Sequence, residues 1–296
     1  MKRRQALSVL ATGASAVLSG CTLGPRDGDS DADTPAQKPP APPYPVAWVL
    51  SSGGPRGFVH VGVLKALFEL GLRPNLVLGS SVGALVGCLA AAGVAMPRIE
   101  ALALETSMVS LFRLNFSGDL WFNGAGLADL VNAEVAGQRL QQFATPFAAV
   151  AMRQDTPALV AFNWGNPGLA VQAACAVEGR LAPVRIGPHA YLDADRLSPL
   201  PVRLARQMGA VRVLAIDASA HEDQAPPSAS TYRASDLRKR ELTQADAAHA
   251  DLVLHPEFGY YTGVSRDYRE RTIAAGYQQT LAQAHALRQL HIKQGT

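Results

Sequence analysis

The strongest catalytic signal in this sequence is a serine flanked by glycines in the segment Gly-Ser-Ser-Val-Gly at 79–83. Gly79 and Gly83 allow a turn tight enough to expose the hydroxyl of Ser81, and the N-terminus of a following helix adds a positive field. An apolar run at 76–78 precedes the turn, and a helical stretch of small residues follows it. This strand-turn-helix pattern predicts a serine nucleophile; the alternative is a tight turn with an exposed serine.

A second glycine-rich turn lies upstream, between an apolar run at 46–50 and a helical pattern at 57–70. Its residues are Gly53, Gly54, Pro55, Arg56 and Gly57. Such a turn leaves backbone N–H groups free to bind an anion, either a phosphate or the oxyanion of an acyl-transfer intermediate. A Walker-type phosphate loop would end in Gly-Lys-Ser or Gly-Lys-Thr, which this turn lacks. Because both turns would follow strands of one parallel sheet, they should converge, and we interpret this one as an oxyanion hole.

A serine nucleophile needs a base, and Asp193 is the candidate because it ends another strand-like run at 190–193. A carboxylate with an ordinary pKa of ~3.9 is a poor base. The site would therefore have to raise this pKa by burial or by the proximity of Asp195. The alternative is that both aspartates are turn and helix-cap residues, which is a common use of aspartate.

Strand-like and helical segments alternate along the rest of the chain, which predicts an α/β fold: a three-layer sandwich with a mainly parallel sheet. Further strand-like runs lie at 148–151, 159–162, 211–216 and 252–254, and a helical stretch at 268–290. Residues 74–97 carry no charge and are numerous enough to span a bilayer. The glycines and serines at 79–83 interrupt them, so we expect a strand and a helix packed inside a protein.

The N-terminus has the features of an export signal. Three basic residues at 2–4 precede an uncharged run at 6–18, and Leu-Ser-Gly-Cys at 18–21 resembles the bacterial lipoprotein box. We expect a signal peptide at 1–20 and a lipidated Cys21; the alternative is a plain secretory signal with an incidental cysteine. The protein would then be anchored in the bacterial cell envelope, in the outer membrane facing the periplasm.

The segment after Cys21 differs sharply in composition from the rest. Seven of the 20 prolines lie within residues 22–45, interleaved with aspartates and small residues. We therefore predict a tether at 21–45 and one domain at 46–296.

Composition excludes several classes of protein. With 48% apolar and 17% charged residues, the chain is neither wholly disordered nor a multi-span membrane protein. Three of the 27 basic residues lie in the predicted signal, which leaves 24 basic against 24 acidic residues and gives no reason to expect a nucleic-acid partner. Three scattered cysteines and unclustered histidines predict neither a disulfide framework nor a metal site. The oligomeric state is left open.

Together the motifs resemble the patatin-like phospholipase family. The similarity includes the turn at 53–57 with the following residues 58–64, the Gly-x-Ser-x-Gly motif, and Leu192-Asp193 before Pro-Leu-Pro-Val at 199–202. It runs in order from about 46 to 216, and residues 170–177 and 181–184 are similar to the segment before that family's aspartate. The resemblance implies a Ser81–Asp193 dyad without histidine, an oxyanion hole at 53–57, no cofactor, and hydrolysis of a lipid or acyl ester through an acyl-enzyme.

Three positions depart from the family's pattern. Asp193-Ala194-Asp195 stands where Asp-Gly-Gly or Asp-Gly-Ala is usual, Glu178 replaces a proline, and Ser52 replaces the first glycine of the oxyanion loop. The first two differences could change the pKa or the geometry of the dyad. The alternative function is therefore a catalytically impaired lipoprotein that binds lipid or a protein partner.

Histidines, cysteines and an aromatic-rich stretch are the other features that could contribute to a site. Ser81, Asp193 and His255 occur in the order of an α/β-hydrolase triad, but too few strands precede Ser81 for that fold. We expect His60 to be a structural histidine, and Cys88 and Cys175 to be small buried residues. The aromatic-rich stretch at 111–122 is either a lid or acyl-chain wall, or ordinary packing in a core or loop.

Overall fold

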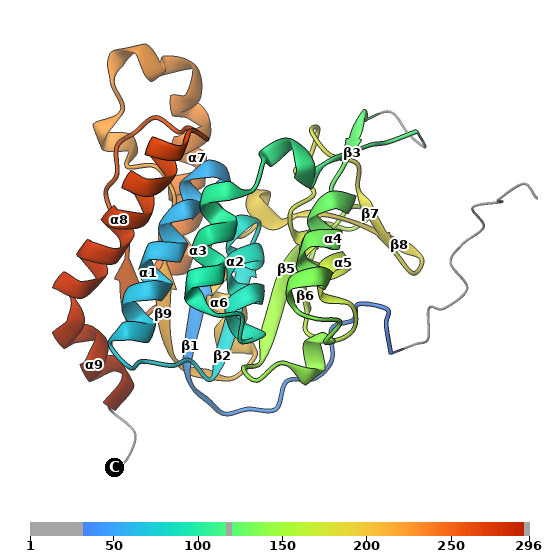
Figure 1. Cartoon of the computed structure of the whole chain (residues 1–296), viewed down its shortest axis with the longest axis horizontal. Helices are drawn as coiled ribbons and strands as arrows, with labels where there is room; N and C mark the ends of the chain where they lie inside the picture. The colour runs from blue at the N-terminus through green and yellow to red at the C-terminus, as the bar shows by residue number, and fades with distance from the viewer. Residues whose placement is uncertain (1–31, 117–119, 293–296) are drawn as a thin grey trace, which may run out of the picture.

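The computed structural model describes residues 32–116 and 120–292. The predicted signal peptide and Cys21 lie outside these residues. One sheet of eight strands organises the domain, in the order β10-β9-β1-β2-β5-β8-β7, with β6 also paired with β5 (Figure 1). The strands are β1 (Tyr44–Leu50), β2 (Leu76–Ser80), β5 (Phe147–Arg153), β6 (Leu159–Phe162), β7 (Val184–Ile186), β8 (His189–Asp193), β9 (Ala210–Ile216) and β10 (Leu252–Leu254).

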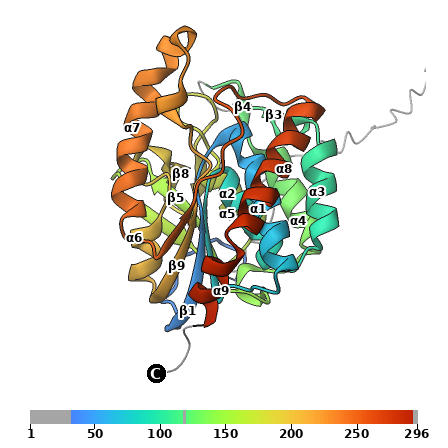
Figure 2. The same cartoon turned by 90° about the vertical axis from the view of Figure 1, so that its left-hand side faces the viewer.

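Helices cover both faces of this sheet, which gives the three layers visible in the side view (Figure 2). One face carries α6 (Val202–Gln207) and α7 (Ser230–Ala247). The other carries α1 (Phe58–Glu69), α2 (Val82–Ala91), α3 (Met96–Glu105), α4 (Ala125–Glu134), α5 (Pro167–Ala174), α8 (Arg266–Ala282) and α9 (Ala284–Ile292). The predicted three-layer α/β sandwich is thus confirmed.

The sheet changes direction at β5. The pairs β10–β9, β9–β1, β1–β2 and β2–β5 are parallel. Strand β5 is antiparallel to β6 and to β8, and β7 is antiparallel to β8. A mainly parallel sheet therefore acquires an antiparallel edge, and the strand that ends at Asp193 belongs to that edge.

The core lies on both sides of the sheet because side chains alternate along each buried strand. In β1, Trp48 and Leu50 pack toward the layer that contains α1, whereas Ala47 and Val49 pack toward α6. All four side chains are fully buried. A strand buried on both faces appears in the sequence as a continuous apolar run, as residues 46–50 do.

Part of the predicted tether lies against the domain. Ala36 forms an antiparallel bridge with Trp164, and the amide of Ala161 donates to the side chain of Gln37. Asp33 forms an ion pair with Arg139. The boundary at residue 46 stays a prediction, but residues 33–37 already contact the sheet layer before β1 begins.

The uncharged stretch at 74–97 forms β2 and α2 in the interior of the domain. Among the helices within 32–116 and 120–292, none is both long enough and apolar enough to cross a bilayer.

Candidate active site

Ser81 sits at the turn between β2 and α2 in a conformation that serine rarely adopts. Its backbone angles are φ 53° and ψ −126°, and it directly precedes the first residue of α2. A positive φ in a residue with a side chain stores strain, which is common at catalytic turns. The side chain is 8% exposed, so the hydroxyl faces a nearly closed site rather than open solvent.

The glycines on both sides of Ser81 are required by close backbone contacts. A Cβ at Gly83 would lie 2.4 Å from the carbonyl oxygen of Leu50, and one at Gly79 would lie 2.3 Å from the carbonyl oxygen of Gly83. The start of α2 therefore packs directly against the end of β1. This contact brings the turn at Ser81 next to the turn that follows β1.

The turn after β1 has the backbone shape of an anion-binding loop. Residues Gly54–Gly57 form a single turn of 3-10 helix, η1, and Gly54 has a φ of 54°. The N–H of Arg56 donates to the carbonyl of Gly53 at 3.1 Å, and Pro55 has no N–H to offer. The N–H groups of Gly53 and Gly54 make no hydrogen bond to another described residue, so they are the donors of this turn best suited to an oxyanion.

The other two members of this loop have packing roles. A Cβ at Gly57 would lie 2.2 Å from a methyl carbon of Val82, so glycine lets the residue after Ser81 pack against the loop. The guanidinium of Arg56 donates to the backbone carbonyl of Tyr260 and lies 5.6 Å from the centre of its ring. Arg56 thus joins the loop to the segment between β10 and α8.

Strand β5 sets Asp193 at the level of Ser81. Ser80 pairs with Val150 of β5 from one side, and Asp193 pairs with the next residue, Ala151, from the other. Adjacent strands lie about 4.8 Å apart, so side chains from β2 and β8 can meet across the end of β5. The hydroxyl of Ser81 lies near the carboxylate of Asp193 and interacts with it favourably, which lowers the pKa of Asp193.

Burial gives Asp193 the pKa of a usable base. Its side chain is 5% exposed, and burial raises its pKa from 3.8 to about 6, against the opposing effect of the nearby Ser81 hydroxyl. The negative charge of Asp195 raises this pKa further. A carboxylate that titrates near 6 is ionised at neutral pH and still accepts a proton readily.

Asp195 is held by residues that the sequence analysis did not connect with it. Its carboxylate forms an ion pair of 2.7 Å with Lys239 of α7 and accepts a hydrogen bond from the hydroxyl of Ser52. Burial raises the pKa of Asp195, but the charge and hydrogen bonds of Lys239 and Ser52 outweigh that effect and lower it. The amide of Asp195 also donates to Asp193 at 2.9 Å.

Cys175 is a second residue that the sequence analysis missed as part of this site. Its thiol donates to the backbone carbonyl of Ser81 at 3.1 Å, and the next carbonyl, that of Ala176, accepts the N–H of Asp193 at 2.9 Å. Burial and the nearby Asp193 carboxylate raise the pKa of the thiol well above 9.0, so it stays protonated. The end of α5 therefore contacts the backbone of both Ser81 and Asp193.

The departures from the family's pattern fit this packing. Ala194 is fully buried, with its methyl group in the core beneath α6, and Asp195 is paired with Lys239. Glu178 lies at the surface in an ion pair with Arg196, at 2.5 Å. None of these contacts displaces the carboxylate of Asp193 from Ser81.

The two histidines considered as bases lie elsewhere. His255 follows β10, which is separated from β2 by two strands, and its ring stacks on His221 at 3.7 Å. His60 is fully buried and donates from Nε2 to the carbonyl of Ser51 at 2.9 Å. Burial lowers the pKa of His60 to about 4, so it is a neutral, structural residue.

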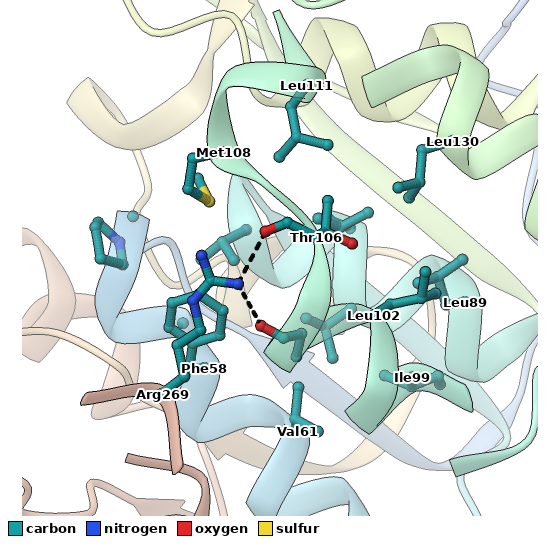
Figure 3. A pocket seen from close by; sticks show the side chains of 17 residues that line it. Phe58, Val61, Leu89, Ile99, Leu102, Thr106, Met108, Leu111, Leu130 and Arg269 are labelled. Carbon is teal, nitrogen blue, oxygen red and sulfur yellow. Dashed lines mark hydrogen bonds between the residues drawn. The ribbon is translucent and has the colours of Figure 1, made fainter. Parts of the chain in front are cut away.

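An apolar cavity of about 100 Å³ opens beside the turn at Ser81 and the turn after β1 (Figure 3). Gly54, Pro55 and Gly57 of the turn after β1 and Val82 of α2 line one end. Aliphatic side chains from α1, α2, α3 and α4 line the rest: Val61, Leu85, Val86, Leu89, Ile99, Leu102 and Leu130. Met108 and Leu111, from the 3-10 helix η2 (Met108–Leu111), complete the wall. Such a lining suits a hydrocarbon chain.

Arg269 is the charged residue that borders this cavity. Its guanidinium donates at 2.9 Å to each of the backbone carbonyls of Ala103 and Thr106, shown dashed in Figure 3. It also lies 5.1 Å from the centre of the Phe58 ring. Arg269 closes the end of α3 onto α8 and leaves the cavity wall apolar.

The aromatic-rich stretch at 111–122 divides into two parts. Leu111 lines the cavity and Phe112 packs against the core, as expected for an acyl-chain wall or ordinary packing. Phe116 and Trp121 instead are 89% and 78% exposed, and Phe122 is 49% exposed. The expectation of core or loop packing is therefore wrong for these three side chains.

Comparison with known proteins agrees with this fold. A family model described as patatin-like phospholipase matches residues 48–206, more than half of the chain. The crystal structure of VipD from Legionella pneumophila has the same fold, with a TM-score of 0.56 and 14% identity over 86% of this chain and 70% of that chain.

Curated proteins show the same relationship. Patatin-like phospholipase domain-containing protein 6 of mouse is 30% identical over 187 residues, which are 60% of this chain and 14% of that protein. An uncharacterized NTE family protein of Mycobacterium bovis is 30% identical over 183 residues, 60% of this chain and 50% of that protein. The chain thus matches half or less of the length of these relatives.

Proposed function

Because the chain belongs to the patatin-like phospholipase family, we propose that it is a lipid acyl hydrolase in which Ser81 and Asp193 form a catalytic dyad. The observation that supports this most directly is the buried carboxylate of Asp193, which interacts with the nearby hydroxyl of Ser81 and whose pKa burial raises to about 6. No histidine within the described residues replaces Asp193 in this position, since His60 and His255 have other partners.

The geometry supports a two-step mechanism. Ser81 Oγ attacks the acyl carbonyl while its proton passes to Asp193. The tetrahedral oxyanion accepts hydrogen bonds from the N–H groups of Gly53 and Gly54. The intermediate collapses, the alcohol leaves with the proton held by Asp193, and an acyl-enzyme remains. Asp193 then takes a proton from water, the hydroxide attacks the acyl carbonyl, and the fatty acid is released as Ser81 regains its proton.

The cavity beside Ser81 supports a lipid acyl chain as the part of the substrate that is recognised. Its wall is aliphatic from the oxyanion loop to α3 and α4. Each CH₂ buried there would contribute about 0.8 kcal/mol, so longer chains should bind more tightly until the cavity is filled.

The decisive experiment is labelling with a fluorophosphonate probe, followed by hydrolysis of a chromogenic ester. We expect labelling at Ser81 that is lost in Ser81→Ala, and hydrolysis that is lost in both Ser81→Ala and Asp193→Asn. His255→Ala should keep full activity and is the matched control. If folded wild-type protein is not labelled, the alternative holds: a catalytically impaired protein that binds lipid or a protein partner in this cavity.

The acyl-chain role of the cavity has its own test. Leu102→Trp fills the cavity at a half-buried wall position, away from Ser81. Hydrolysis of long-chain esters should fall at least ten-fold while that of an acetyl ester is retained. An equal fall for both substrates would place the acyl chain elsewhere.

We further propose that lipidation of Cys21 anchors the enzyme in the bacterial cell envelope, in the outer membrane facing the periplasm. The lipoprotein-like box at 18–21 and the proline-rich segment after it support this location. Cys21→Ser should abolish incorporation of labelled fatty acid and release the protein from membranes. Persistent fatty-acid labelling of that variant would refute the assignment.

A further inference from the structure

A group of large apolar side chains is exposed next to the acyl cavity. The antiparallel strands β3 (Arg113–Leu114) and β4 (Phe122–Asn123) pair through Leu114 and Phe122, and the amide of Asn115 donates to the carbonyl of Trp121 at 2.8 Å. We call the following five residues the apolar rim. They are Val109 (81% exposed), Leu114 (56%), Phe116 (89%), Trp121 (78%) and Phe122 (49%). Soluble proteins seldom expose such a group without a binding partner.

The rim is continuous with the cavity wall. Met108 and Leu111 of η2 point into the cavity in Figure 3, while Val109 between them is exposed. Strand β3 begins two residues after η2 and lies at the top of Figure 1, the end of the domain at which α1 begins beside the oxyanion loop. An acyl chain that leaves the cavity past η2 would therefore meet the rim before it meets open water.

The rim is also joined to the segment that holds the dyad. The carbonyl of Phe122 accepts the N–H of Ala182 at 2.9 Å, and Ala182 belongs to the loop between α5 and β7. Val177, in that loop, is a further exposed apolar residue, at 38%.

Two basic residues near the rim are paired with acidic ones, whereas Arg180, two residues before Ala182, is exposed and has no ion pair with a described residue. Arg113 lies 3.6 Å from Asp129, and Arg196 lies 2.5 Å from Glu178. A nucleic acid or an acidic protein surface would require a cluster of unpaired basic residues, and a single arginine does not form one. Exposed Trp and Phe side chains instead suit the boundary between the headgroups and the acyl chains of a bilayer.

We propose that the apolar rim inserts into the surface of a lipid bilayer and there opens the acyl cavity to the membrane. The contact rests on apolar burial, so it should occur on zwitterionic vesicles and persist at high salt. The role in substrate entry rests on the proposed function, whereas the bilayer contact does not require hydrolysis.

Trp121 supplies a direct test of insertion that is independent of catalysis. The chain has three tryptophans, of which Trp48 is fully buried and Trp164 half-buried. In full-length protein carrying Ser81→Ala and Trp164→Phe, phosphatidylcholine vesicles with brominated acyl chains should quench the emission of Trp121, in low salt and in 0.5 M salt. Replacement of Trp121 by Phe in that background should remove the quenched component.

Two results would overturn the bilayer contact. Equal quenching of the Trp121 emission by aqueous iodide with and without vesicles would show that this side chain stays in water. Shielding of Trp121 from iodide without vesicles, in a species that sediments as a dimer, would show that a second copy of the chain covers the rim.

The role in substrate entry is tested with active enzyme. Phe116→Ser and Trp121→Ser should each lower hydrolysis of phosphatidylcholine in vesicles roughly ten-fold or more, since each removes a large inserted side chain. Hydrolysis of a water-soluble acetyl ester should not change. Val211→Ser and Ile292→Ser, at positions 57% and 69% exposed on other parts of the surface, are the matched controls and should affect neither reaction. Equal effects of rim and control variants would refute this role.

Discussion

Asp193→Asn should make the protein more stable while it abolishes activity. The buried carboxylate of Asp193 has a pKa of about 6 in the folded chain, against 3.8 as its usual value. Asparagine is uncharged and of the same size. Its side-chain oxygen can accept the amide of Asp195, as the carboxylate does, and its NH₂ group can donate to Ser81. The variant therefore removes the cost of burying a charge and keeps the packing.

The magnitude and sign follow from proton linkage. A pKa that rises from 3.8 to about 6 on folding corresponds to about 3 kcal/mol of stability. The wild-type protein has this contribution fully below pH 3.8 and loses it as the pH rises through 6. The gain in Asp193→Asn should therefore be near zero below pH 4, about 1.5 kcal/mol at pH 5 and about 3 kcal/mol at pH 8.

The assay is reversible urea denaturation of the wild type and the variant at pH 5 and pH 8, with refolding verified. Asp129→Asn is the control, because Asp129 is 70% exposed, and it should change stability by no more than about 0.5 kcal/mol at either pH. A gain that is equal at both pH values, or a loss of stability at pH 8, would contradict the assignment of a raised pKa to Asp193.

Three further predictions concern the groups around the dyad. The rate of ester hydrolysis should rise with pH to a plateau, with its midpoint near pH 6 where Asp193 ionises. Asp195→Asn removes a negative charge that raises the pKa of Asp193, so the midpoint of the pH–rate profile should move to lower pH. Gly83→Ala should destabilise the protein by about 1–3 kcal/mol and abolish probe labelling, because its Cβ would lie 2.4 Å from a backbone oxygen. Gly87→Ala, whose Cβ would meet only side chains, at 3.1 Å and beyond, is the control and should keep most labelling. Cys175→Ala should lower kcat roughly ten-fold at unchanged KM, because the hydrogen bond from the Cys175 thiol to the strained turn at Ser81 is lost. Cys175→Ser should restore most of the rate. If the serine variant is as slow as the alanine variant, that hydrogen bond has no positioning role.

Local patterns in the sequence predicted most of the fold and the core of the candidate site. Strand-like runs of three to six residues became strands of the sheet, and the glycines around Ser81 marked a turn whose close contacts exclude a Cβ. These features are recognisable because each depends on neighbouring residues. The direction of β8 was not predicted, since a short apolar run has the same composition in a parallel and in an antiparallel strand.

The residues that surround the dyad could not be identified in this way. Lys239 lies 44 positions after its partner Asp195, within a run of charged residues that looks like an ordinary solvated helix face. Cys175 acts through a backbone carbonyl, which leaves no trace in residue types. Exposure of Phe116 and Trp121 depends on what packs nearby, and hydrophobicity alone cannot distinguish a core aromatic from one at the surface.

The candidate site residues and the cavity wall lie in separate segments of the chain, which affects how substrate preference could diversify in this family. Ser81 and the turn at 53–57 follow strands of the central sheet and Asp193 ends one, whereas α3, η2, the β3–β4 hairpin and α4 lie between α2 and β5 and add no strand to it. This one insertion supplies much of the cavity wall and the whole apolar rim. Exchange of residues 96–134 between relatives should therefore transfer chain-length preference and membrane preference as a unit, while the reaction chemistry of the recipient is conserved.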